Sequence, residues 1–202
     1  MTEAQWLTTT RTHVLLTALG ETASARKLRL LAVACCRLIP DLLDEPRWRA
    51  AVEAAELFAD GSIDWPELEA ARFGAQSVAP HGNEGAAVAV CSSVLHFRAK
   101  EVCMHARAAA CQPTRNAEQA HLVRDIFGNP FRPVAFDPAW RTDTAVAIAR
   151  TMYDAREFGA MPILADALQD AGCEDEVILA HCREPGLHVR GCWVCDKVLG
   201  LS

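Results

Sequence analysis

Residues 25–39 read ARKLRLLAVACCRLI, and their apolar side chains recur with the period of an α-helix. On a helix the following side chains share one face: Leu28, Leu31, Ala32, Cys35 and Ile39. Ser24 stands where a helix-capping residue is expected. Pro40 is expected to end or kink the helix, because proline has no backbone N–H to donate. This stretch therefore predicts one amphipathic helix with defined ends.

Helix signals of the same kind recur from one end of the chain to the other. The expected starts are Thr2, Thr12, Pro46, Asp64 with Glu67, Asn116 and Thr142. The expected stops are Gly20, Gly61 and Gly128. A long apolar helix is expected at about 86–111, and three short ones at MPILADALQDAG, EDEVILAHCR and HVRGCWVCDKVLG. We find no alternating strand pattern of useful length, so the sequence predicts an all-α fold, an irregular array of about ten helices.

One extended loop interrupts this pattern at residues 128–140, GNPFRPVAFDPAW. It is rich in proline, and we expect its aromatic side chains, Phe131, Phe136 and Trp140, to insert into the core. The length suits a single helical domain covering residues 1–202, with a sub-boundary near 112–116 as the alternative.

Composition and charge exclude several classes of function. The formal net charge is −6, which disfavours non-specific binding to nucleic acid. No apolar stretch approaches the length of a membrane span, and the first residues do not resemble a secretion signal. We therefore expect a cytoplasmic location, where the nine cysteines stay reduced.

Cysteine and histidine gather in the last thirty residues, AGCEDEVILAHCREPGLHVRGCWVCDKVLG (171–200). If a helix begins near His188, then His188, Cys192 and Cys195 form one stripe. A fourth group from the preceding helix region would complete a tetrahedral site that suits zinc: Cys173, His181 or Cys182. His181 and Cys182 point about 100° apart on a helix, so they are not expected to bind the same ion.

Three other interpretations of the same residues stay open. Leu199 continues the stripe, so the cysteines also fit a buried helix face, which is the ordinary place for free thiols. Cys192 and Cys195 have the C-x-x-C spacing of a redox pair, although no thioredoxin-like pattern surrounds them. A nucleophilic Cys192 would need His181 or His188 as base and Asp196 as orienting group. Farther up the chain, Arg124, Asp125 and Arg132 are expected to pair with one another, with the rim of a binding surface as the alternative.

Several strings resemble a bacterial protein family that has no assigned activity: KLRLLAVACCR, LVRDIFGNPFRPV, MPILADALQDAGC, ILAHCR and HVRGCW. The resemblance covers most of the chain and implies a soluble intracellular protein. Members of that family are expected to have an aromatic residue in place of Pro40 and an apolar residue in place of Cys195. Cys195 is therefore a poor candidate for a metal or redox role common to the family. The resemblance moves the metal-ligand hypothesis to Cys173, His181, His188 and Cys192.

These observations favour a non-enzymatic helical protein that acts through contact with a protein partner. The first alternative is a helical module stabilised by zinc through the C-terminal cysteines and histidines. The second is an enzyme or thiol redox protein that uses a reactive cysteine.

Overall fold

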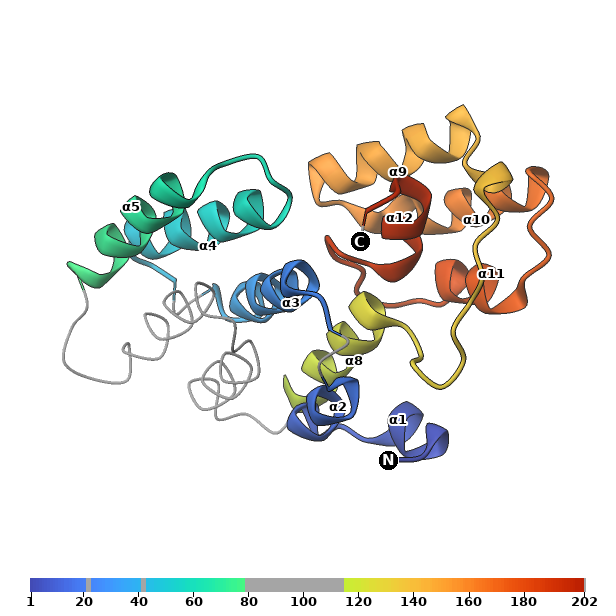
Figure 1. The fold of residues 1–202 in the computed structure, drawn as a ribbon, viewed down its shortest axis with the longest axis horizontal. Helices are drawn as coiled ribbons and strands as arrows, with labels where there is room; N and C mark the ends of the chain where they lie inside the picture. Colours follow the sequence, from blue (N-terminus) through green and yellow to red (C-terminus); the bar gives the residue numbers. More distant parts are fainter. Residues whose placement is uncertain (21–22, 41–42, 79–114, 202) are drawn as a thin grey trace. The chain divides into compact units, whose positions relative to one another are not determined.

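The computed structural model describes residues 1–202 except for 21–22, 41–42, 79–114 and 202. The described residues form ten α-helices and two short 3₁₀ helices, with no strand among them (Figure 1). This confirms the all-α prediction. The helix expected at 86–111, and residues 112–114 of the expected sub-boundary, lie outside the described residues. Within those residues, no helix is both long and apolar enough to cross a membrane.

The chain divides into two compact units, Met1–Val123 and Arg124–Ser202. The first contains α1 (Glu3–Thr8), α2 (Thr12–Leu19), α3 (Ala25–Arg37), α4 (Pro46–Ala59), α5 (Trp65–Gln76) and most of α8 (Arg115–Phe127). In this unit α4 packs against both α3 and α5. Arg37 of α3 forms a two-pronged ion pair with the fully buried Glu56 of α4. The Arg37 guanidinium balances the negative charge of the buried Glu56 carboxylate at the contact between α3 and α4.

Local capping explains where most helices begin. Thr2 with Gln5, and Asp64 with Glu67, form complete capping boxes, as expected for the second pair. Ser24 and Thr142 cap α3 and α9 as expected. The expectation for Thr12 is wrong by one position: it is the first helical residue, and Arg11 precedes it without a side-chain cap.

The second unit is built from α9 (Asp143–Ala155), α10 (Met161–Asp170), α11 (Glu176–Arg183) and α12 (Trp193–Leu199), with 3₁₀ turns at Pro138–Trp140 and Phe158–Ala160. Helix α10 packs against α9 and α11, and α12 packs against α9 and α11. The large side chains at the centre of this core are Met161, Leu164, Leu168, Ile178, Trp193 and Val198. The last turn of α8 also belongs to this unit.

The proline-rich loop at 128–140 follows the prediction in part. Phe136 and Trp140 pack against the core of the second unit, and their rings meet edge to face at 5.3 Å. Phe131 does not insert: it is 41% exposed, at a turn where Asn129 accepts a hydrogen bond from the Phe131 N–H. The turn holds the Phe131 backbone at the surface, and the side chain stays in solvent.

Candidate metal centre

Four side chains of the second unit converge on one small volume: Asp125, His181, His188 and Cys192. One ligand atom from each lies within 4.8 Å of the other three. The His188 Nδ1 is 2.6 Å from the Asp125 Oδ1, and the His181 Nε2 is 3.3 Å from the same oxygen. The Cys192 Sγ lies 3.2 Å from the His181 Nε2 and 4.0 Å from the His188 Nδ1. Together these four residues form a candidate metal centre, called the metal centre below for short.

The four ligands come from three separate parts of the unit. Asp125 lies in the last turn of α8, and His181 lies in the last turn of α11. His188 belongs to the irregular segment 184–192, and Cys192 is the N-terminal capping residue of α12. The centre therefore joins the end of α8, the end of α11 and the start of α12.

The helical stripe expected from His188 through Cys195 is wrong. Helix α12 begins only at Trp193, so His188 and Cys192 are not one helical turn apart on a continuous helix. They meet because the chain turns between them: the Cys192 N–H donates to the Val189 carbonyl, and Gly191 has a φ of +91°. A left-handed φ of this kind is open to glycine and is incompatible with helix.

The other cysteines named from the sequence lie outside the metal centre. Cys173, Cys182 and Cys195 are fully buried free thiols in the apolar core of the second unit. Cys173 follows the turn that ends α10, and Cys195 contacts the Met161 sulfur at 3.5 Å. Of the four proposed ligands, the structure thus groups His181, His188 and Cys192, with Asp125 in the position expected for Cys173. As expected from helix phase, His181 joins the group and its neighbour Cys182 does not.

Asp125 is the member that the sequence interpretation missed. Its side chain is fully buried and contacts both imidazoles, whereas the sequence led us to expect pairing with Arg124 and Arg132. A signal for this was present: Asp125 lies between Leu122 and Ile126, on the apolar face of α8, and both neighbours are buried. A carboxylate on such a face needs a charged or hydrogen-bonding partner, because burial of an unpaired charge is costly.

Backbone and ring contacts hold the ligands in place. The Val189 N–H donates to the Asp125 Oδ2 at 3.0 Å, which leaves Oδ1 directed at the histidines. The Trp193 ring lies tilted against the His181 ring, with the ring centres 5.1 Å apart. The same ring packs against Gly128, where an added Cβ would lie 3.3 Å from it. The His188 Nε2 is buried without a hydrogen-bond partner among the described residues, so its Nδ1 side sets the orientation of the ring.

Arg190 anchors the segment that carries two of the ligands. Its guanidinium donates to the Tyr153 carbonyl at 2.7 Å and lies 4.9 Å from the centre of the Tyr153 ring. Arg190 lies midway between His188 and Cys192 in the sequence. Its contact with Tyr153 therefore fixes the segment 184–192 to the C-terminal end of α9. Ligands supported by such surrounding contacts are positioned before an ion arrives.

The four groups are largely shielded from solvent, and each affects the ionisation of the others. The side chains of Asp125, His188 and His181 are 0%, 6% and 17% exposed, and Cys192 is fully buried. Burial would raise the pKa of Asp125, but hydrogen bonds from His181 and His188 outweigh it and lower the pKa. Burial lowers the pKa of His181, yet Cys192 and Asp125 more than offset it and raise the value to about 9.

His188 and Cys192 favour their protonated forms, as His181 does. Burial lowers the pKa of His188, but Asp125 and Cys192 outweigh it and raise the pKa to about 10. Burial raises the pKa of the Cys192 thiol well above its ordinary value. Without an ion, protons therefore remain on His181, His188 and Cys192, around the ionised carboxylate of Asp125. A metal ion has to displace these protons, so its affinity is expected to rise with pH.

The geometry fits a metal site better than a catalytic triad. In a triad the nucleophile and the carboxylate contact opposite nitrogens of one imidazole. Here the Cys192 Sγ and the Asp125 Oδ1 both approach the same nitrogen of His181, at 3.2 and 3.3 Å. One nitrogen carries at most one hydrogen and cannot fully serve both. Four ligands about 2.0–2.3 Å from a shared zinc ion would lie roughly 3.3–3.6 Å apart. The observed separations of 2.6, 3.2, 3.3 and 4.0 Å lie on both sides of that range, so small shifts would complete the shell.

The donor set also selects the kind of metal. One thiolate, two imidazoles and one carboxylate oxygen are borderline-soft ligands that suit a tetrahedral zinc ion. Calcium and magnesium prefer shells made only of oxygen and are disfavoured by the sulfur and the nitrogens.

Comparison with known proteins adds no assignment. No protein-family model matches the chain, and no curated protein or solved structure matches it significantly.

Proposed function

We propose that the second unit is a zinc-stabilised helical module whose ion is held by Asp125, His181, His188 and Cys192. The observation that carries this proposal is the convergence of four ligand atoms within 4.8 Å, in a position shielded from solvent. Four protein ligands complete a tetrahedral shell and leave no open position for water or substrate, so the ion has a structural role.

A structural ion is well placed in this unit. The unit has only about 80 residues, and domains of that size commonly need a metal or disulfides to supplement a small core. Two of its helices that begin or end at the centre are short: α11 is 8 residues long and α12 is 7. Helices of this length are marginal alone, and a shared ion would fix their ends.

A closed structural ion leaves the outer surface of the module as the part that acts. This agrees with a role in protein–protein contact, the function that the sequence left as the default. In this proposal the metal supplies rigidity and the surface supplies recognition.

Elemental analysis of the full chain, purified without chelators from cells supplied with zinc, tests the proposal. We expect about one zinc per chain, because structural sites bind with apparent free energies of roughly 10–16 kcal/mol and survive purification. Prolonged dialysis against a strong chelator should remove the ion and lower the thermal midpoint. Zinc well below stoichiometric amounts, with no uptake on reconstitution and no effect of the chelator on stability, would rule the module out.

A further inference from the structure

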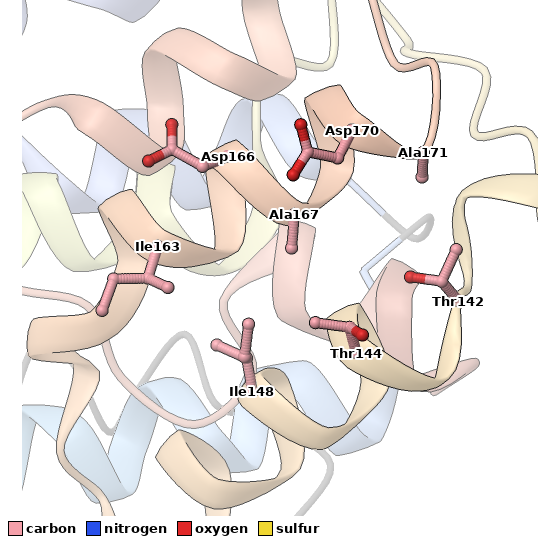
Figure 2. Close-up of a pocket in the computed structure, with 8 residues that line it drawn as sticks. All are labelled: Thr142, Thr144, Ile148, Ile163, Asp166, Ala167, Asp170 and Ala171. Carbon is pink, nitrogen blue, oxygen red and sulfur yellow. The ribbon is translucent and has the colours of Figure 1, made fainter.

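A second feature of the same unit is a hollow of about 380 Å³ between α9 and α10. Figure 2 shows Ala167 and Ile163 of α10 on the side of Ile148 and Thr144, with the carboxylates of Asp166 and Asp170 along the far edge of the same helix. None of its lining residues belongs to the metal centre. The hollow is here called the α9–α10 groove.

The floor of the groove is apolar. Ile163 is 59% exposed, and Ile148 and Ala167 lie half-buried beside it. Covering a large aliphatic side chain such as that of Ile163 removes apolar surface from water, which favours association. An apolar side chain from a partner would therefore gain by entering the groove.

The α10 edge of the groove is acidic. Asp166 and Asp170 are four positions apart on α10, so both project from one face of the helix, and both are exposed (Figure 2). Asp166 accepts a hydrogen bond from the exposed Arg183 at 2.8 Å, whereas Asp170 has no ion-pair partner among the described residues. Glu174 and Glu176, which follow α10 in the sequence, are also exposed.

No basic side chain lines the groove. An apolar floor beside an acidic edge is complementary to a segment with the opposite arrangement, one large apolar side chain flanked by cations. An anionic membrane surface or a nucleic acid would be repelled by the same edge.

We propose that the α9–α10 groove binds a basic, amphipathic segment of a protein partner. A large aliphatic side chain of the partner enters beside Ile163 and Ile148. One lysine or arginine side chain pairs with Asp170, and a second displaces the exposed Arg183 from Asp166. The proposal concerns the surface of the module and does not require the ion itself, although it assumes that the second unit is folded.

The probe comes from a library of random twelve-residue peptides displayed on phage. Peptides that bind the immobilised full-length protein are selected from it. We expect the enriched peptides to carry lysine or arginine within about one helical turn of a large aliphatic residue. The affinity of a selected, fluorescently labelled peptide is then measured by anisotropy. Its Kd should rise with added salt, because the contacts are exposed charges.

Variants locate the binding site. The double variant Asp166→Asn, Asp170→Asn and the single variant Ile163→Ser should each raise the Kd about tenfold or more. The matched control Asp154→Asn, Glu157→Gln removes two exposed charges outside the groove and should leave the Kd unchanged. Circular dichroism checks that each variant stays folded, which is expected because an exposed ion pair contributes little to stability.

Two results would overturn the proposal. One is a set of enriched peptides with no cationic bias, or a Kd that changes equally in the groove variants and in the control. The other is sedimentation showing a dimer that Ile163→Ser dissociates, which would make the groove a contact between copies of this chain.

Discussion

Replacing Asp125 by asparagine is expected to abolish stoichiometric zinc and to lower the stability of the second unit by about 3–5 kcal/mol. Asparagine keeps the size of the side chain but removes the charge that two histidines share. A neutral amide oxygen is a much weaker zinc ligand than a carboxylate. Native-state hydrogen exchange at the amides of α11 and α12 measures the loss in the second unit alone.

The control for this experiment is Asp154→Asn, which makes the same chemical change at an exposed position. It should alter stability by less than about 0.5 kcal/mol and leave zinc unchanged. The experiment is repeated after zinc is removed by a chelator. If zinc stabilises the unit, Asp125→Asn should cost less there, because only the ion pairs and hydrogen bonds with the two histidines remain to be lost. An equal cost with and without zinc would mean that Asp125 stabilises the unit through the histidines alone and not through an ion.

Among the buried cysteines of the second unit, only Cys192→Ala is expected to remove the ion. Cys195→Ala and Cys182→Ala are matched controls, because all three thiols are fully buried and lie within one short region. On packing alone the three variants should cost similar amounts, on the order of 1 kcal/mol each. Loss of the ion should add a further drop of more than about 10 °C in the zinc-loaded thermal midpoint of Cys192→Ala.

This comparison also tests the redox alternative. A functional pair of Cys192 and Cys195 would make both substitutions equivalent, and a C-x-x-C zinc site would lose the ion in either variant. Zinc retained in Cys192→Ala, or lost equally in Cys195→Ala, would contradict the ligand assignment.

Local signals in the sequence were sufficient to predict the class of fold. Capping residues such as Ser24, Asp64 and Thr142 act on backbone groups within three positions of themselves, so their effect is visible in the sequence. The final helix was extended too far because His188 and Cys192 happen to have helical spacing. The segment before α12 is instead held by contacts from elsewhere, the Val189 N–H on Asp125 and Arg190 on Tyr153.

The candidate site was predictable only where its ligands are close along the chain. The density of cysteine and histidine near the C-terminus identified His181, His188 and Cys192. Asp125 lies 63 positions before His188, and no local spacing connects them. The position of Asp125 on the apolar face of α8 indicates that its carboxylate needs a buried partner. Only the three-dimensional structure identifies that partner.

X-ray absorption spectroscopy at the zinc edge, on the full-length protein loaded with one equivalent of zinc, tests the ligand set most directly. The fold brings together one sulfur, two imidazole nitrogens and one carboxylate oxygen. The expected spectrum therefore shows one sulfur at about 2.3 Å and three nitrogen or oxygen neighbours at about 2.0–2.1 Å, with the outer-shell scattering of two imidazoles. A shell with two or more sulfurs, or with none, would contradict the centre formed by Asp125, His181, His188 and Cys192.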